Sequence, residues 1–100
     1  NDALSIYNKI RGLDPFPGAR TTLYLNLEKE EKKLLIYKSD YIVEKHNNKT
    51  GNVIVSDGVL KISCNNGYVI IKELKVEGKK KMKTRDLLNG FRISDNSYVK

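Results

Sequence analysis

The chain has little of what metal binding and nucleophilic catalysis require. Its 100 residues include one cysteine, one histidine and no tryptophan. A metal site needs three or four converging ligands, and His46 lies in the polar stretch EKHNNKTG with no second histidine or cysteine nearby. One cysteine excludes an internal disulfide. Because Cys64 lies in the alternating stretch LKISC, we expect it to be a buried, reduced thiol.

Long apolar runs and export signals are also absent. No apolar run approaches the roughly 18 residues that a membrane span requires. The opening residues, NDALSIYNKIRG, lack the basic start and apolar core of a signal peptide. The chain does not begin with methionine, so we expect it to be a piece of a longer protein. We expect a cytoplasmic location, with no membrane partner and no bound metal.

Catalytic signatures are missing as well. The sequence contains no GxxxxGK(S/T) phosphate loop, no GxGxxG and no HExxH. Its acidic residues are scattered over charged turns and strands, whereas acid–base chemistry needs titratable groups gathered in a water-excluded pocket. We therefore expect these 100 residues to carry no catalytic residue.

What the sequence does have is a concentration of positive charge. The net charge is +7, and residues 79–100 hold seven of the 19 basic side chains but two of the 12 acidic ones. Most of that excess lies in the stretch EGKKKMKTRDLLNG, residues 77–90. Such a patch indicates an anionic partner, with nucleic acid first and an anionic membrane second. The alternative is a solvated run of lysines that only confers solubility.

The first twenty residues predict a helix and a stiff connector. Asn1 or Asp2 can cap the helix, and its apolar face is Ala3, Ile6, Tyr7 and Ile10, at the spacing of one helical face. Gly12 is placed to end it. The following LDPFPGA, residues 13–19, contains both prolines of the chain and predicts a rigid turn.

The middle of the chain predicts strands rather than helices. Alternating apolar residues separated by turn signals indicate five strands, at Thr21–Leu27, Leu34–Val43, Asn52–Val55, Val59–Cys64 and Tyr68–Val76. Stretches such as LLI, residues 34–36, are apolar on both faces. This favours a small closed barrel with helices packed outside it.

The last twenty residues predict one more short helix. Thr84 can cap it, Leu87, Leu88 and Phe91 would pack inward, and Gly90 would end it. The polar segment Ser94–Lys100 reads as a mobile tail.

Two blocks of sequence resemble the C-terminal domain of methionyl-tRNA formyltransferases. Residues 8–19, NKIRGLDPFPGA, resemble the signature N-K/Q-I/V-R-A/G-L/F-N/D-P-W/F-P-G-A that opens this domain. Residues 74–82, LKVEGKKKM, followed by DLLNG at 86–90, are similar to its ending, L-Q-x-x-G-K-K/R-x-M and D/E-F-L-N-G. Lys75 replaces the usual Gln, Leu87 the usual Phe, and Asn66 the usual Gly near the second hairpin.

The resemblance implies a fold and a domain organisation. The expected fold is mainly β, an OB-like five-stranded barrel with an N-terminal helix and a short C-terminal helix. Residues 1–20 would form the linker helix and Pro-rich turn, residues 21–93 the OB-like domain, and residues 94–100 the polar tail. The catalytic residues and the cofactor 10-formyltetrahydrofolate would belong to a separate N-terminal domain of the same polypeptide.

The function that the resemblance implies is tRNA binding, in which this domain positions initiator methionyl-tRNA for N-formylation during translation initiation. The residues expected to contact tRNA phosphates are Lys79, Lys80, Lys81, Lys83, Arg85, Lys9, Arg11 and Arg20. The strand tyrosines could stack on bases, although strand tyrosines are more often half-buried packing residues.

Two alternatives remain open from the sequence. One is a structural C-terminal domain of a sugar formyltransferase, against which the basic cluster argues. The other is a stand-alone OB-type module that binds single-stranded nucleic acid, against which the block at residues 8–19 argues.

Overall fold

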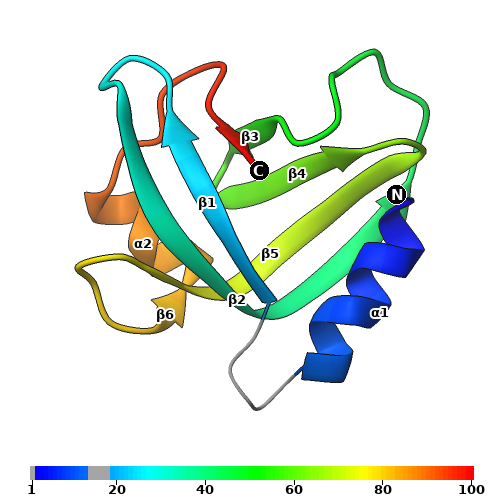
Figure 1. Cartoon of the computed structure of the whole chain (residues 1–100), viewed down its shortest axis with the longest axis horizontal. Coiled ribbons are helices and arrows are strands. Elements are labelled where there is room, and N and C mark those ends of the chain that lie inside the picture. Colours follow the sequence, from blue (N-terminus) through cyan, green and yellow to red (C-terminus); the bar gives the residue numbers. More distant parts are fainter. Residues whose placement is uncertain (1, 14–18) are drawn as a thin grey trace.

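Alternating apolar residues build a single curled antiparallel sheet in the computed structural model, which describes residues 2–13 and 19–100 (Figure 1). Within these residues the chain forms two helices, α1 (Ala3–Leu13) and α2 (Thr84–Gly90). The longer strands are β1 (Ala19–Leu25), β2 (Glu30–Val43), β3 (Val53–Ser56), β4 (Val59–Cys64) and β5 (Gly67–Val76). Two short strands are β6 (Met82–Lys83) and β7 (Tyr98–Val99).

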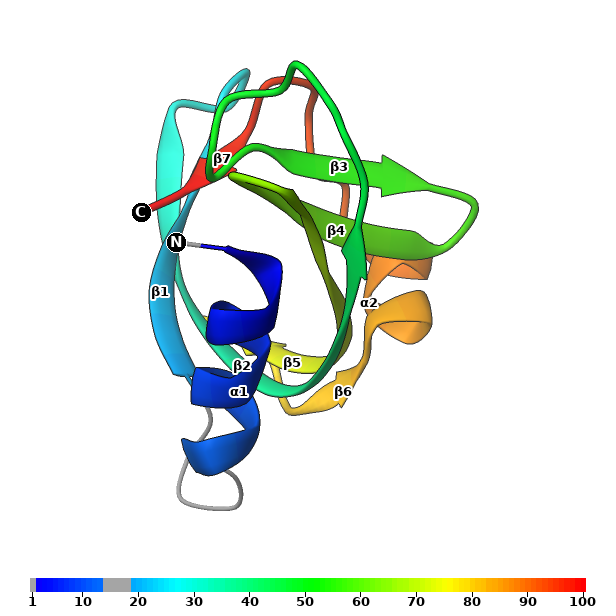
Figure 2. The ribbon, with the colours of Figure 1, turned by 90° about the vertical axis from the view of Figure 1, so that its right-hand side faces the viewer.

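The sheet curls until its two ends meet. The strand order is β3-β4-β5-β2-β1-β7, and β6 pairs with β5. At the two ends, the Val53 N–H donates to the Ser97 carbonyl (2.9 Å) and the Val99 N–H donates to the Gly51 carbonyl (2.8 Å). Asn52 also forms an isolated bridge with Tyr98. Figure 2 shows the resulting ring of strands, in which β7 meets the chain where it enters β3.

The core lies inside this ring. One face of each strand is buried there, and the most completely buried large side chains include Leu23, Leu34, Leu60, Ile71 and Leu74. Leu87 of α2 joins the same core. The predicted fold class is confirmed: the domain is mainly β, a curled antiparallel half-barrel with an N-terminal helix and a short C-terminal helix. The strands β6 and β7 were not predicted.

The helix α1 packs mainly against β2. Ala3 and Ile10 are buried, and the Tyr7 ring lies 5.0 Å from the Tyr41 ring. Of the two predicted caps, Asp2 is within the described residues, and its carboxylate accepts the Ser5 N–H at 2.8 Å. This hydrogen bond lowers the pKa of Asp2. The helix ends one residue beyond Gly12, and the predicted Pro-rich turn lies outside the described residues.

The predicted cap of α2 is wrong. Lys83 occupies the N-cap position without a side-chain cap, and Thr84 lies inside the helix. The buried Thr84 hydroxyl instead donates to the Ile71 carbonyl at 2.7 Å. Thr84 therefore ties α2 to β5, a role that depends on tertiary contact and not on local sequence.

The expectation of a mobile tail after Ile93 is also wrong. Ser94 and Ser97 are fully buried. The Ser97 hydroxyl donates to the Ser94 carbonyl at 2.7 Å and accepts the Asn26 N–H at 3.1 Å, while the Ser94 hydroxyl accepts the Leu27 N–H at 3.2 Å. These two serines satisfy the backbone of the β1–β2 turn and lead the chain into β7.

Replacing Ser97 with alanine should therefore destabilise the domain. The Asn26 N–H would lose its partner in a partly buried site, which costs about 1–3 kcal/mol. Urea unfolding measures this as a lower midpoint at unchanged slope. Ser56→Ala, at an exposed position of β3, is the control and should change stability by less than about 0.5 kcal/mol. Equal effects of the two variants would contradict a special role for Ser97.

Candidate nucleic-acid interface

The outer side of the curled sheet carries a strip of positive charge. Residues that alternate with the core residues of β1, β2, β5 and β6 point away from the interior. We call this surface the convex face, defined by the side chains of Arg20, Lys33, Leu35, Tyr37, Lys75, Lys81 and Lys83.

Strand register brings its members together from distant parts of the sequence. Arg20 lies opposite Leu35, and Leu35 lies opposite Lys75. Directly opposed residues share a face, and neighbouring strands are about 5 Å apart. Arg20 and Lys75 therefore flank the half-buried Leu35 within about 10 Å of each other. One row further on, Lys33 lies opposite Thr22.

The hairpin between β5 and β6 adds two lysines. The Lys81 ammonium lies 3.1 Å from a Glu73 carboxylate oxygen and 4.4 Å from the Tyr37 ring centroid. Lys83 lies opposite Glu73, on the same side as Lys81. Met82, between them, packs toward the core. The contacts with Glu73 and Tyr37 hold the Lys81 amine over β2 while leaving it exposed.

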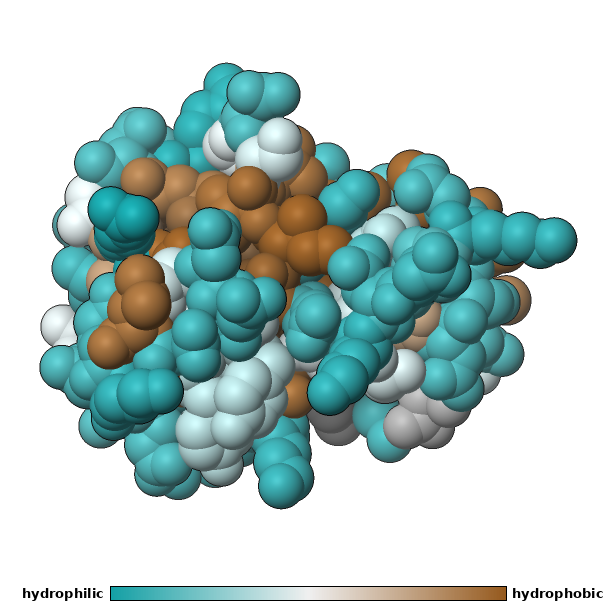
Figure 3. Space-filling view, turned by 90° about the horizontal axis from the view of Figure 1, so that it is seen from above, coloured by the Kyte–Doolittle hydropathy of each residue, from teal (hydrophilic) through white to brown (hydrophobic). Residues whose placement is uncertain are grey.

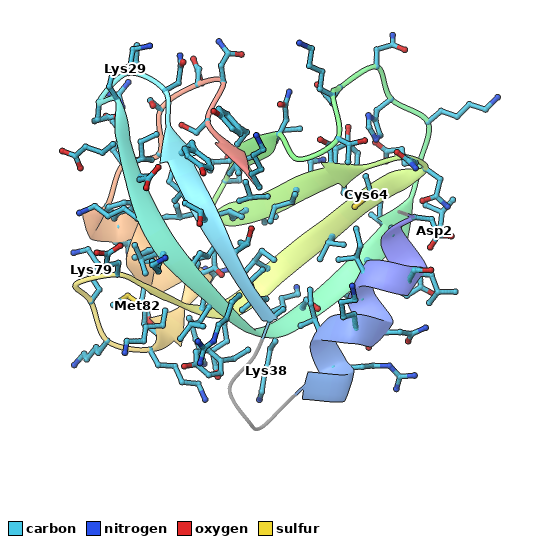
Figure 4. The ribbon with its side chains drawn as sticks, in the orientation of Figure 1. Asp2, Lys29, Lys38, Cys64, Lys79 and Met82 are labelled. Carbon is cyan, nitrogen blue, oxygen red and sulfur yellow. The ribbon has the colours of Figure 1, made fainter. Side chains whose placement is uncertain are left out.

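The structure does not bring all the predicted phosphate-binding residues onto one surface. The Lys79 ammonium lies 5.7 Å from the Phe91 ring, on the α2 side of the hairpin, and Lys80 is exposed on the turn. Arg85 lies beside Gly58 of the β3–β4 turn. The run of basic residues thus diverges around the hairpin, on which Figure 4 labels Lys79 and Met82.

The basic residues of α1 lie far from the β5–β6 hairpin. In Figure 1, α1 and the β5–β6 hairpin are on opposite sides of the molecule. The Arg11 guanidinium donates to Asn8 at 2.8 Å and lies 5.7 Å from the Tyr7 ring. Lys9 lines a cavity of about 270 Å³ between α1 and the barrel, and Arg20 lines the same cavity. Of the three N-terminal predictions, Arg20 alone belongs to the convex face.

Surfaces elsewhere on the domain lack this positive charge. Figure 3 shows exposed apolar atoms bordered by polar side chains on the face seen from above. A groove of about 480 Å³ beside β3 is lined by apolar residues of β3, such as Ile54 and Val55, and by polar or acidic residues, such as Asn52, Asp95 and Asn96, and neither lysine nor arginine lines it. Phosphate recognition therefore fits the convex face and not this groove.

Reactive groups are held in structural roles. Cys64 is buried at 1% exposure, and burial raises the pKa of its thiol, which disfavours the nucleophilic thiolate. The His46 Nε2 lies 2.7 Å from the Cys64 carbonyl and 3.1 Å from the Gly67 carbonyl, and its Nδ1 accepts the Asn48 N–H. His46 therefore anchors the segment between β2 and β3.

Two further findings concern the part of the chain that the structure describes. In that part, neither helix is long and apolar enough to cross a membrane. In the same residues, His, Cys, Asp and Glu side chains do not gather in a group of three or more that could hold a metal ion.

Together, the strand order and register define a small, mainly β domain whose curled sheet carries a cationic strip on its outer side. Comparison with known families identifies the family to which this domain belongs. The model of the family described as "Formyl transferase, C-terminal domain" matches residues 1–92. The chain belongs to this family of formyl transferase C-terminal domains.

Curated relatives agree with this assignment. The chain is 40% identical over 92 residues to the methionyl-tRNA formyltransferase of Bacteroides thetaiotaomicron, a match that covers 90% of this chain and 28% of the relative. It is 36% identical over 94 residues to that of Flavobacterium johnsoniae, covering 94% of this chain and 29% of the relative. The chain thus spans less than a third of the length of these formyltransferases.

Sequence reasoning missed two cations of the convex face, Lys33 and Lys75, as site residues. Each alternates with buried apolar neighbours, such as Leu34 and Leu74, so its outward direction could be read from the sequence. What could not be read is that β1, β2 and β5 are neighbours in a register that places these lysines beside Arg20.

Proposed function

We propose that this domain binds tRNA through the convex face and positions initiator methionyl-tRNA for N-formylation by a catalytic domain of the same polypeptide, in translation initiation. The observation that carries the proposal is the strip on which strand register places Arg20, Lys75 and Lys81 around Leu35 and Tyr37. The relatives' printed name, methionyl-tRNA formyltransferase, supplies the identity of the RNA and the reaction.

The chemistry of the strip suits an RNA duplex. The deep, narrow major groove of A-form RNA is closed to side chains, so a docking domain contacts the backbone and its phosphates. Lysine and arginine on a rigid sheet provide point charges at fixed separations. Two carboxylates near this face already have partners within the domain. Glu73 pairs with Lys81, and Glu77 accepts the Lys33 N–H at 2.9 Å. Such contacts position an RNA without reading its sequence.

The remaining parts of the reaction lie outside this domain in our proposal. The formyl donor, 10-formyltetrahydrofolate, and the catalytic residues would belong to the portion of the polypeptide that the relatives have beyond the matched region. The site of action would be the cytoplasm. The domain would contribute affinity, and discrimination of the initiator tRNA would come mainly from the catalytic domain.

Binding should be weak, nearly independent of sequence and strongly dependent on salt. With four or five phosphates neutralised, log K should fall with log salt at a slope of about −3 to −4. Titration of this chain with tRNA across a range of potassium chloride concentrations measures the slope. An RNA duplex of unrelated sequence serves as the control and should bind with a similar slope. Failure to bind tRNA even at low salt would overturn the proposal.

A further inference from the structure

Two tyrosines form a stacked pair where β1 meets β7. Tyr24 and Tyr98 lie directly opposite each other in the register, with ring centroids 4.9 Å apart and planes at 15°. Tyr98 remains 42% exposed. By contrast, the Tyr7–Tyr41 pair is tilted by 42°, and Tyr41 packs against the core. The Tyr24–Tyr98 pair is therefore a flat, accessible aromatic surface. Tyr98 also lies beyond residues 1–92, the part matched by the family model.

A cavity of about 400 Å³ opens beside this pair. It is lined by both tyrosines together with Asn26, Lys29, Glu30 and Glu31. The volume falls within the range of small-ligand sites, roughly 300–1,000 Å³. Lys29 is on the β1–β2 turn, at the upper left of Figure 4. The cavity therefore combines an aromatic surface with an amide, an amine and carboxylates.

The register orders these groups in a row. Tyr98 lies opposite Tyr24, and Tyr24 lies opposite Glu31, so all three side chains share the outer face of β7, β1 and β2. This row is continuous with the convex face, because Arg20 lies on the same face of β1, two alternations away. A polynucleotide on the convex face can therefore extend into the cavity.

The charges favour a base and not a phosphate at the end of the row. The carboxylates of Glu30 and Glu31 repel phosphate, but a carboxylate accepts a hydrogen bond from the amino group of a base, as in recognition of cytosine. Aromatic side chains stack on any base because every base has a π-face. Lys29, on the turn, is available to the phosphate that follows.

We infer that the stacked pair of Tyr24 and Tyr98 is a subsite for one unpaired nucleotide base of the bound RNA, with Glu31 favouring bases that carry an amino group. The inference rests on the proposed function, which it extends from duplex phosphates to a single-stranded nucleotide beside them. The domain then prefers RNA in which a duplex adjoins an unpaired residue.

Fluorescence can locate the base directly. Because the chain contains no tryptophan, Tyr98→Trp introduces a single reporter that retains an aromatic ring at the site. A duplex with a 3′ single-stranded extension should quench this tryptophan by more than half at saturation, whereas a blunt duplex should quench it little. Tyr7→Trp is the matched control, on α1, and should respond to neither RNA. Equal quenching of both reporters, or of neither, would overturn the subsite.

Affinity provides the second readout. Tyr98→Ala should weaken binding of the extended duplex roughly 5- to 150-fold, the range for loss of one stacked base, and leave the blunt duplex unchanged. Tyr98→Phe should bind like the parent, and a cytosine extension should bind more tightly than a uracil extension. If the Tyr98→Ala chain does not fold, the quenching of Tyr98→Trp and the affinity of Tyr98→Phe for the extended duplex test the subsite instead.

The outcomes separate the two proposals. Equal weakening of blunt and extended duplexes by Tyr98→Ala would overturn the base subsite and leave the proposed phosphate binding standing. Absence of binding to any RNA by the parent chain would overturn both.

Discussion

Replacing Gly67 with alanine should remove most of the domain's free energy of unfolding. A Cβ atom built at this position would lie 1.9 Å from the Ile42 carbonyl oxygen and 2.9 Å from the Val43 Cα. Real Cβ atoms do not approach backbone atoms so closely, and the obstacle is β2 itself and not a flexible side chain. The chain must therefore move β2 away from β5 where Val43 and Gly67 pair.

Moving β2 would disturb several other interactions at once. The Gly67 carbonyl lies 3.1 Å from the His46 Nε2, and the Glu44 N–H donates to the Asn66 carbonyl at 2.9 Å. Overpacking commonly costs 1–3 kcal/mol, and loss of these hydrogen bonds adds to it, so we expect a loss of about 4 kcal/mol or more. In a domain of this size that lowers the Tm by roughly 15–30 °C.

Thermal unfolding followed by far-ultraviolet circular dichroism measures the loss. Gly12→Ala is the matched control, since a Cβ there meets nothing within 4 Å and alanine favours helix. That variant should be as stable as the parent or more stable by up to about 1 kcal/mol. A Gly67→Ala domain within about 1 kcal/mol of the parent would mean that β2 does not pass so close to β5.

The features that sequence predicted well are those that local chemistry decides. The β3–β4 hairpin is an example. Asp57 and Gly58 both have positive φ, at 52° and 76°, in the two-residue turn that their sequence favours. The α1 helix is another, since its cap and its buried face follow from the spacing of Asp2, Ala3 and Ile10.

The features that sequence missed are decided by contacts between distant segments. Ser94 and Ser97 look like polar tail residues, and they are buried because they meet the β1–β2 turn about 70 positions earlier. Threonine is a residue type that commonly caps helices, yet the Thr84 hydroxyl donates its hydrogen bond to a β5 carbonyl. A hydroxyl has the same local preferences in either role, so sequence alone does not distinguish them.

In the candidate site, too, some features follow from local sequence and others depend on contacts between distant segments. The run of lysines after Gly78 was recognised by composition, but a run in sequence is not a patch in space. Within it, Lys79 and Lys81 turn to opposite sides of the hairpin, toward Phe91 and Tyr37. The convex face is instead assembled by register, which depends on the pairing of whole strands. Arg20 and Lys75 are 55 positions apart in sequence and share one row.

Neutralising that row should have the largest effect on RNA binding. In the triple variant Arg20→Gln, Lys75→Gln and Lys81→Gln, three phosphate contacts are lost. Each contact contributes about 0.7–0.9 to the slope of log K against log salt, so the slope should become less steep by roughly 2–3. The same dependence implies an affinity loss of roughly 100- to 500-fold at about 0.1 M salt. Stability should change little, because the three side chains are exposed.

A second triple variant tests whether RNA affinity depends on the position of the cations or on the net charge of the domain. Lys45→Gln, Lys49→Gln and Arg92→Gln remove the same charge from exposed positions outside the convex face. If register creates the binding surface, this variant should bind tRNA within about fivefold of the parent, since distant charges are screened beyond roughly 10 Å at 0.1 M salt. If the two variants lose affinity equally, the domain attracts RNA by its overall charge of +7, and the convex face has no privileged role. Titrations of both variants with one tRNA at matched salt decide between these two mechanisms.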